Sequence, residues 1–408
     1  MFICTCIYLL LSNKMEYNIS KHYGIHLSVE NFLEYTNKSQ PSVDDTLEYF
    51  NEVETRRRIV PLVYLALLVI LGVPGNILIM FVYIVKFQRK TKHRMFVVSL
   101  AIADFLVCTF TIPFEIAQMT HEYTFYAEWV CKLGRTVNVI FTTSSALILV
   151  ALSVNRYRRI CHQMTRPLTS IQVLLSIISI VCVTIIFAWP ESILSGIKLH
   201  DLGDNVTGFD CSNKEDYTNT NYPLIYSIGT LIVYSFCMFS LMIMCILVGR
   251  KILKHIKFSS QFSIPTIVVT PAKSSSSSNV TPNGSIKEFH RNKIVFVKSY
   301  IFRKGQANRA IRHKANSPMR VTRTALIVSI CFIIVFIPFI AIKIIAAVTG
   351  GNIMPPSPLA SILLPTLART HFVNNVLNFI IYISIDLAFR KHCKKLFTST
   401  IFKVFRFS

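Results

Sequence analysis

The chain alternates between long apolar stretches and shorter polar connections. Seven apolar stretches are each long enough to cross about 30 Å of hydrocarbon, which takes about 20 residues of helix. They cover residues 61–86, 95–119, 132–157, 171–189, 222–248, 321–347 and 361–385. This pattern predicts an all-α membrane protein with a seven-helix transmembrane bundle.

The residues after the seventh stretch keep a helical period but have one charged face. Apolar side chains recur at Leu387, Phe389, Cys393, Leu396 and Phe397, and basic ones at Arg390, Lys391, Lys394 and Lys395. Such a pattern predicts a short amphipathic eighth helix lying along an anionic membrane surface. Cys393 is a candidate for palmitoylation there, with an unmodified thiol as the alternative.

The pattern also divides the chain into three parts. Residues 1–59 form an N-terminal tail, residues 60–385 the bundle, and residues 386–408 the eighth helix with a short tail. From about residue 250 to 320 the chain becomes rich in Lys, Ser, Asn and Pro. This composition predicts a long and mostly disordered loop within the bundle.

Basic residues gather in alternate connections. Of the 43 Lys and Arg residues, 31 follow the first, third, fifth and seventh stretches. Because such residues mark the cytoplasmic side of a membrane protein, we expect an extracellular N-terminus and a cytoplasmic C-terminus. The charge pattern thus predicts a multi-pass protein of the plasma membrane.

Composition excludes several other classes of protein. Hydrophobic residues make up 52% of the chain and charged residues 15%, with a mean hydropathy of +0.50. These values leave no room for a large soluble catalytic domain, so we predict that the protein is not an enzyme. A net charge of +23 could indicate nucleic-acid binding. The bases, however, flank membrane spans and no basic fold with interleaved aromatics accompanies them, so we expect the bilayer and no nucleic acid as partner.

The first residues and the sequons concern the outer surface. Residues 2–11 are apolar but too few to span a bilayer, and they lack the basic region and cleavage site of a signal peptide. A signal peptide is one interpretation of this segment, and translation that begins at Met15 is the alternative. Three glycosylation sequons lie on the predicted outside, at Asn18, Asn37 and Asn205.

Asp104 lies well inside the second stretch, where an ionised group is costly and usually functional. Counting residues along each helix places several polar residues at the same depth. These residues are Asn76, Ser145, Asn374, Asn375 and Asn378. A carboxylate surrounded by hydroxyl and amide oxygens suits a small hard cation such as sodium. The alternative is a hydrogen-bond network that only specifies helix packing.

Two cysteines next to the bundle face an oxidising compartment in the predicted topology. Cys131 opens the third stretch and Cys211 lies in the loop between the fourth and fifth. We predict a bridge between them that ties this loop over the mouth of the bundle. Cys4 and Cys6 are also predicted outside, and spacing alone does not exclude them as partners.

Several short motifs follow one another in a fixed order along the chain. They are Gly75-Asn76, Leu100-Ala101-Ile102-Ala103-Asp104, Trp129-Val130-Cys131, Asn155-Arg156-Tyr157, Phe332 with Phe336-Ile337-Pro338, Asn374-Asn375-Val376-Leu377-Asn378 with Tyr382, and Phe389-Arg390. This ordered set, from about residue 61 to 397, resembles the class A, rhodopsin-like G-protein-coupled receptors, and most of all a divergent member of their neuropeptide-receptor branch. The resemblance implies an extracellular ligand, with a heterotrimeric G protein and arrestin as cytoplasmic partners.

The resemblance also assigns roles to single residues. Arg156, flanked by Asn155 and Tyr157, should engage the G protein, and Phe336 with Phe332 and Pro338 should form an aromatic switch beneath the ligand. Tyr382 should move inward on activation. Asp104 with Ser145, Asn374 and Asn378 would be a sodium pocket.

Several positions depart from the family pattern, among them the usual Trp missing from span four, a central Pro and an inner Tyr missing from span five, and three positions in the switch motifs. Asn155 stands where Asp is usual, Phe336 where Trp is usual, and Phe379 where span seven usually has Pro. The loss of the Asp should weaken the restraint on Arg156. The loss of the Pro is expected to straighten span seven and to hinder Tyr382 from reaching its active position.

The outer half of the bundle bears on the ligand. Opsins resemble one another in a lysine in the middle of span seven, and residues 361–385 contain no lysine. Amine receptors resemble one another in an Asp in span three, and this chain has Asn138 at that position. The candidate pocket residues are instead Glu115, Gln118, Arg135, Asn138, Lys343, Arg369 and His371. This mixture of both signs and amides suits a peptide-like ligand. For Lys343 and Arg369 the alternative is a side chain that snorkels to the interface.

Two functional hypotheses of different class follow. The first is a ligand-activated receptor that couples to a G protein. The second is a non-signalling membrane protein, either a binding or scavenging receptor on the same scaffold or a transporter. Transporters usually show repeated halves or broken helices around a midplane site, and the sequence shows neither.

Overall fold

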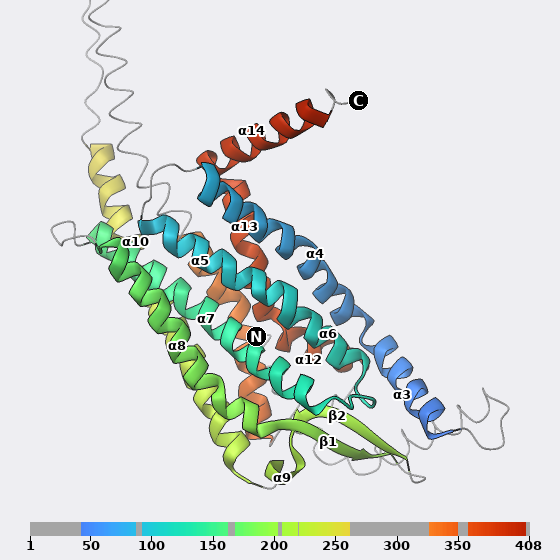
Figure 1. The fold of residues 1–408 in the computed structure, drawn as a ribbon. Coiled ribbons are helices and arrows are strands. Elements are labelled where there is room, and N and C mark those ends of the chain that lie inside the picture. The colour runs from blue at the N-terminus through green and yellow to red at the C-terminus, as the bar shows by residue number, and fades with distance from the viewer. Residues whose placement is uncertain are drawn as a thin grey trace, which may run out of the picture.

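The computed structural model describes residues 42–86, 92–161, 168–202, 206–218, 220–261, 326–349 and 358–404. Figure 1 shows a bundle of long helices with a two-stranded hairpin across one end and the C-terminal helix leading away from the other. We call these ends the hairpin end and the α14 end. The sequons at Asn18, Asn37 and Asn205 lie outside the described residues.

Six of the predicted spans are continuous helical segments that are long and apolar enough to cross a membrane. They run from Ile59–Val85, Arg94–Thr120, Glu128–Cys161, Ser170–Leu194, Tyr222–Lys254 and Leu326–Val348. The elements are α4 (Ile59–Phe81) with η1 (Val82–Lys86), α5 (Lys92–Leu106) with η2 (Val107–Thr111) and α6 (Ile112–Thr120), α7 (Glu128–Cys161), α8 (Ser170–Leu194), and α10 (Tyr222–Gln261). The sixth span keeps its residue range, Leu326–Val348, as its name.

The seventh predicted span is interrupted. It consists of α12 (Pro358–Ala368), the 3₁₀ turn η3 (Thr370–Val373) and α13 (Asn374–Ile385). The helix α13 continues without a break through Phe379, as expected where the Pro is absent, and the interruption of span seven lies upstream at η3. Gly75 makes room for this aromatic ring, since a Cβ at Gly75 would lie 2.6 Å from the Phe379 Cγ atom. The bundle therefore keeps seven membrane-crossing segments.

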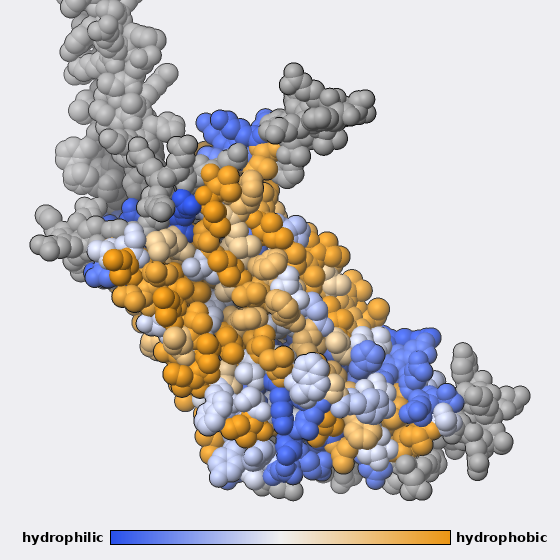
Figure 2. Space-filling view, viewed as in Figure 1, coloured by the Kyte–Doolittle hydropathy of each residue, from blue (hydrophilic) through white to orange (hydrophobic). Residues whose placement is uncertain are grey.

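Apolar side chains surround the middle of the bundle. Figure 2 shows this apolar belt, with hydrophilic residues concentrated at the hairpin end and at the α14 end. The largest interior cluster joins α5, α7, α10, Leu326–Val348 and α13, and it includes the buried Phe332 and Phe336. Apolar residues on both the interior and the exterior are what a lipid-embedded bundle requires.

The hairpin end is shaped by a sheet that the hydropathy pattern did not predict. Strands β1 (Ser195–Asp201) and β2 (Thr207–Asn213) pair antiparallel, and Cys211 of β2 bonds to Cys131 at the start of α7. The predicted Cys131–Cys211 disulfide is thus confirmed. Residues between α6 and α7 join the sheet as well, because the Phe125 N–H donates to the Phe209 carbonyl at 2.9 Å. The short helix α9 (Glu215–Thr218) leads on toward α10.

A further helix, α3 (Val43–Arg57), occupies part of the predicted N-terminal tail. The Ser42 hydroxyl caps its first turn, where Asp44 and Asp45 also lie, and Arg56 and Arg57 stand in its last turn. This distribution of charge favours the helix dipole. The segment was predicted to be part of a tail, and its short, polar sequence gives no hydropathy signal for a helix.

Beyond α13 the chain turns sharply into α14 (Leu387–Val404), as the eighth-helix prediction requires, with 89° between Thr370–Ile385 and Phe389–Leu396. Phe389 packs under the end of the bundle beside Tyr83 and Tyr382. Cys393 lies in the same cluster and exposes only 5% of its surface. Palmitoylation of Cys393 stays a prediction, and it would require the thiol to leave this cluster.

Candidate functional site

Two ion pairs cross the interior at the hairpin end. The Arg135 Nε donates to Glu191 Oε1 at 2.8 Å and to the Ser195 hydroxyl at 2.9 Å. Arg369 directly follows α12, and its Nε donates to Glu115 Oε2 of α6 at 2.9 Å. Each of these side chains exposes about a quarter of its surface or less. The predicted Arg135, Glu115 and Arg369, together with Glu191, thus form two closed ion pairs.

The two predicted amides at this end are also engaged. The Asn138 Nδ2 donates to Glu115 Oε1 at 2.9 Å, so the Glu115 carboxylate accepts from both Asn138 and Arg369. The Gln118 Nε2 donates to the Cys211 carbonyl at 2.6 Å and thereby fastens β2 to α6. Asn138 and Glu115 belong to one polar cluster, whereas Gln118 supports the hairpin.

Lys343 and His371 both lie next to the ring of Phe339. The Lys343 Nζ is 5.8 Å from the centroid of the Phe339 ring, and this lysine is exposed. The ring of His371 is 4.2 Å from that of Phe339 and 4.1 Å from that of Phe372. His371 is buried, and its Nδ1 has no hydrogen-bond partner among the residues that the structure describes.

An aromatic floor, formed by Phe332, Phe336 and Tyr234, lies between these residues and the middle of the bundle. The rings of Phe332 and Phe336 stack with centroids 4.0 Å apart, and Phe336 also contacts His371 and Tyr234 of α10. The Tyr234 hydroxyl shares a 3.2 Å hydrogen bond with Thr143 of α7. The predicted aromatic pair therefore sits between the polar mouth and the lower bundle, with Pro338 two residues further along the same helix.

Asp104 lies at the centre of the bundle and is fully buried. Its Oδ1 accepts from the Ser145 hydroxyl at 2.6 Å, and its Oδ2 from the Asn378 Nδ2 at 2.7 Å. Asn76 forms a neighbouring link, because its Nδ2 donates to the Asn375 carbonyl at 2.8 Å. Two of the predicted residues, Ser145 and Asn378, thus bind Asp104, while Asn76 joins α4 to the backbone of α13.

Buried oxygens remain for a cation or water at this centre. Within the described part of the chain, the Oδ1 atoms of Asn76 and Asn378 have no hydrogen-bond donor. Asn374 is buried beside Asn375 in α13. Carboxylate, hydroxyl and amide oxygens are the donors that a hard cation prefers, so these residues fit sodium chemically.

Arg156 marks the α14 end of α7 and exposes only 7% of its surface. The hydroxyl of Tyr382 lies within hydrogen-bonding reach of its guanidinium. Losing the span-seven Pro therefore does not keep Tyr382 away from Arg156 in this structure. Asn155 is buried next to it, and Tyr157 is half-buried on the following position.

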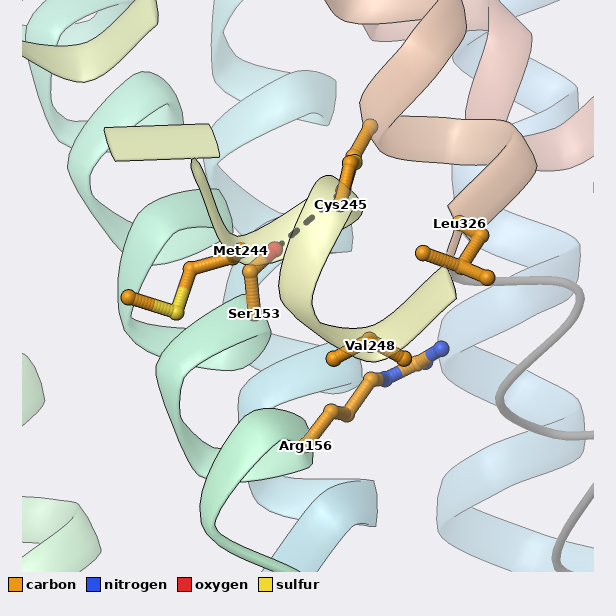
Figure 3. A pocket seen from close by; sticks show the side chains of 7 residues that line it. Ser153, Arg156, Met244, Cys245, Val248 and Leu326 are labelled. Atoms are coloured by element: carbon orange, nitrogen blue, oxygen red, sulfur yellow. Dashed lines mark hydrogen bonds between the residues drawn. The ribbon is translucent and has the colours of Figure 1, made fainter. Parts of the chain in front are cut away.

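A small cavity of about 20 Å³ opens beside Arg156, large enough for about one water molecule. Its lining residues are Ser153, Arg156, Met244, Cys245, Val248, Leu326 and Ser329. Figure 3 shows that they come from α7, α10 and the start of Leu326–Val348. Three helices thus converge on Arg156 without filling the space between them.

Sequence reasoning missed Glu191, the partner of Arg135. Glu191 follows Trp189 and Pro190 at the predicted end of the fourth span, and the structure extends α8 to Leu194. A lone acid directly beyond an aromatic residue at a membrane boundary was the available signal. Glu122 was missed too. It pairs with Arg58 at 2.5 Å, and burial raises the pKa of its carboxyl although Arg58 acts in the opposite direction.

The model of the family described as 7 transmembrane receptor (rhodopsin family) matches residues 75–382, well over half of the chain. The chain belongs to the rhodopsin family of seven-transmembrane receptors. The receptor is accordingly not an enzyme, and it is a multi-pass membrane protein, as the spans indicate.

Individual relatives of this rhodopsin-family receptor match over shorter stretches. A stretch of 117 residues is 34% identical to 5-hydroxytryptamine receptor 4 of Cavia porcellus and covers 28% of this chain and 29% of that receptor. A stretch of 156 residues is 26% identical to the Alpha-2 adrenergic receptor of Carassius auratus, covering 37% of this chain and 36% of that one. The matched stretches thus span about a third of these curated relatives.

Proposed function

We propose that the receptor binds an extracellular ligand at the hairpin end and activates a heterotrimeric G protein at the α14 end. The observation that supports this most directly is Arg156, which is buried where α7, α10 and Leu326–Val348 converge and lies within reach of Tyr382. Arrestin is a second proposed partner at the same end. This proposal places the N-terminus outside, which agrees with a disulfide at the hairpin end.

The proposed ligand is a peptide-like molecule. The mouth presents two ion pairs, an exposed lysine and an aromatic floor, and such mixed walls suit a ligand that has charges, amides and apolar side chains. Two of the relatives are named for 5-hydroxytryptamine or as adrenergic receptors. In this chain Asn138 donates to the carboxylate of Glu115, which also accepts from Arg369. An ammonium ligand that paired with Glu115 would have to displace the Arg369 guanidinium.

Sodium is the proposed cofactor of the Asp104 centre. The proposal rests on the Asp104 carboxylate, the Ser145 hydroxyl and the acceptor oxygen of Asn378, all buried at one point. A cation that binds one conformation more tightly than the other shifts the balance between them. These residues would hold the ion, and it would stabilise the ligand-free arrangement of the helices around it.

The signalling proposal is tested in cells that express the receptor at graded surface levels without added ligand. We expect G-protein activation to rise with surface level and to disappear in Arg156→Ala. The matched control is Arg158→Ala, because Arg158 is exposed two residues further along α7 and does not line the cavity. If the unmodified receptor never exceeds empty cells, with or without a pooled peptide library, the non-signalling alternative is favoured.

A further inference from the structure

The charges at the hairpin end of the bundle do not balance. Three cationic side chains reach the interior there from three separate segments: Arg135 of α7, Lys343 of Leu326–Val348, and Arg369 after α12. Two carboxylates, Glu191 and Glu115, lie among them. All five groups lie at the hairpin end of the bundle.

Both carboxylates are already bound by arginine. Arg135 holds Glu191 at 2.8 Å and Arg369 holds Glu115 at 2.9 Å, and each pair is largely removed from solvent. Separating either pair would leave a mostly buried charge without a partner, which is unfavourable. The two pairs are therefore closed, and one positive charge, that of Lys343, is left over.

Lys343 has no ion-pair or hydrogen-bond partner among the described residues, and its neighbour is the Phe339 ring at 5.8 Å. That ring packs inward against Tyr234, Phe336 and His371, so the ammonium lies over an interior aromatic surface. This position argues against a lysine that merely snorkels to the interface. A cation–π contact at an exposed site is weak and leaves the ammonium donors available.

We propose that Lys343, Phe339 and His371 form a subsite, the Lys343 subsite, that binds a ligand carboxylate with an adjoining aromatic or apolar group. The carboxylate pairs with the Lys343 ammonium, and the apolar group packs against Phe339. The buried His371 ring lies 4.2 Å from the Phe339 ring and holds it in place from inside the bundle. The proposal deepens the proposed function and rests on it, because it names the chemistry of the ligand.

The same arrangement disfavours the amine chemistry after which two relatives are named. An ammonium ligand entering this space meets a positive charge from Lys343, and both nearby carboxylates are occupied. Rejection by like charge is a usual source of specificity. The receptor should therefore prefer an anionic over a cationic ligand of equal size.

Direct binding to the purified full-length receptor in nanodiscs tests the Lys343 subsite. The probes are N-acetyl-phenylalanine, its neutral amide, N-acetyl-glutamyl-phenylalaninamide and phenethylamine, each observed by saturation-transfer NMR up to about 10 mM. We expect the first probe to bind at least about tenfold more tightly than its amide, one hydrogen-bonded charge being worth about that factor. The glutamyl probe decides whether a side-chain carboxylate serves as well as a terminal one.

Four variants make the result specific. Lys343→Met should abolish the preference for the carboxylate, Lys343→Arg should keep it, and Lys343→Glu should transfer it to phenethylamine. The control is Lys132→Met, because Lys132 lies at the same end but is already paired with Glu128 at 2.6 Å. An unchanged preference in Lys343→Met, an equal loss in Lys132→Met, or no binding of any probe overturns the subsite. Ligand-free signalling that depends on Arg156 would still stand in each of those cases.

Discussion

The contribution of the Glu115–Arg369 ion pair to the stability of the hairpin end can be tested quantitatively. Glu115 exposes 14% and Arg369 20% of the side chain, and the Arg369 Nε lies 2.9 Å from Glu115 Oε2. Removing one partner of a fully buried pair costs about 3–5 kcal/mol. Because water reaches part of Arg369, and because Gln still accepts from Asn138, we expect Glu115→Gln to cost about 2 kcal/mol.

A double-substitution cycle separates this pair from general damage. Glu115→Gln, Arg369→Gln and the double variant are compared by thermal unfolding of the receptor in nanodiscs, where about 2 kcal/mol shifts the apparent Tm by roughly 4–8 °C. We expect the double variant to be less destabilised than the sum of the single variants by about 1.5 kcal/mol. The exposed Lys132–Glu128 pair is the control and should show a coupling below about 1 kcal/mol.

Additivity would refute the reasoning. If the effects of Glu115→Gln and Arg369→Gln sum to within about 0.5 kcal/mol, the two groups do not stabilise each other. The charge balance that singles out Lys343 would then lose one of its two closed pairs, and the pocket would have to be described again with Glu115 as a free carboxylate.

Four further outcomes follow from the structure. Cys131→Ser and Cys211→Ser should reduce surface expression equally, with no added loss in the double variant; unequal losses in flow cytometry would contradict a single shared function of the bridge. Asp104→Asn should remove any difference in apparent Tm between sodium and choline chloride, and a receptor that shows no such difference before substitution has a packing network instead of a sodium site. Asn155→Asp should lower ligand-free signalling several-fold, because a charged hydrogen bond to the neighbouring arginine is about 1 kcal/mol stronger than a neutral one; unchanged output argues against this restraint. Asn51→Ala deletes two hydrogen bonds, to Thr124 and to the Tyr123 N–H, and should cost about 1–2 kcal/mol, seen as faster hydrogen exchange throughout α3; unaltered exchange would mean that apolar contacts alone hold that helix.

The membrane-spanning part of the fold was predictable because span length and apolar composition are set by the bilayer itself. Residues 95–119, for example, fall within the observed Arg94–Thr120. The hairpin and α3 were not predictable in this way. Both segments are short and polar. Their structure depends on the Cys131–Cys211 bond and on contacts with distant loops, and neither of these leaves a hydropathy signal.

The candidate site was predictable as a set of residues but not as a set of partners. Helical counting brought Asp104 to Ser145 and Asn378 because depth along a straight helix follows from residue number. The same counting gives no rotation about the helix axis, so it could not show that Glu115 binds Arg369, 254 positions away. Glu191 was missed because the predicted span ended at residue 189, five residues before the observed end of α8 at Leu194.

The docking of α3 changes which surfaces a ligand can contact at once. Leu47 and Phe50 of α3 pack with Leu202 and Val206 at the turn of the hairpin, and Arg58 ties the end of α3 to Glu122. Figure 1 accordingly shows α3 extending from α4 along the rim instead of standing free of it. The outward face of α3 is therefore held at a fixed place beside the hairpin. A ligand that contacts both α3 and the hairpin end of the bundle binds two sites of one chain, so its second contact forms at a high effective concentration.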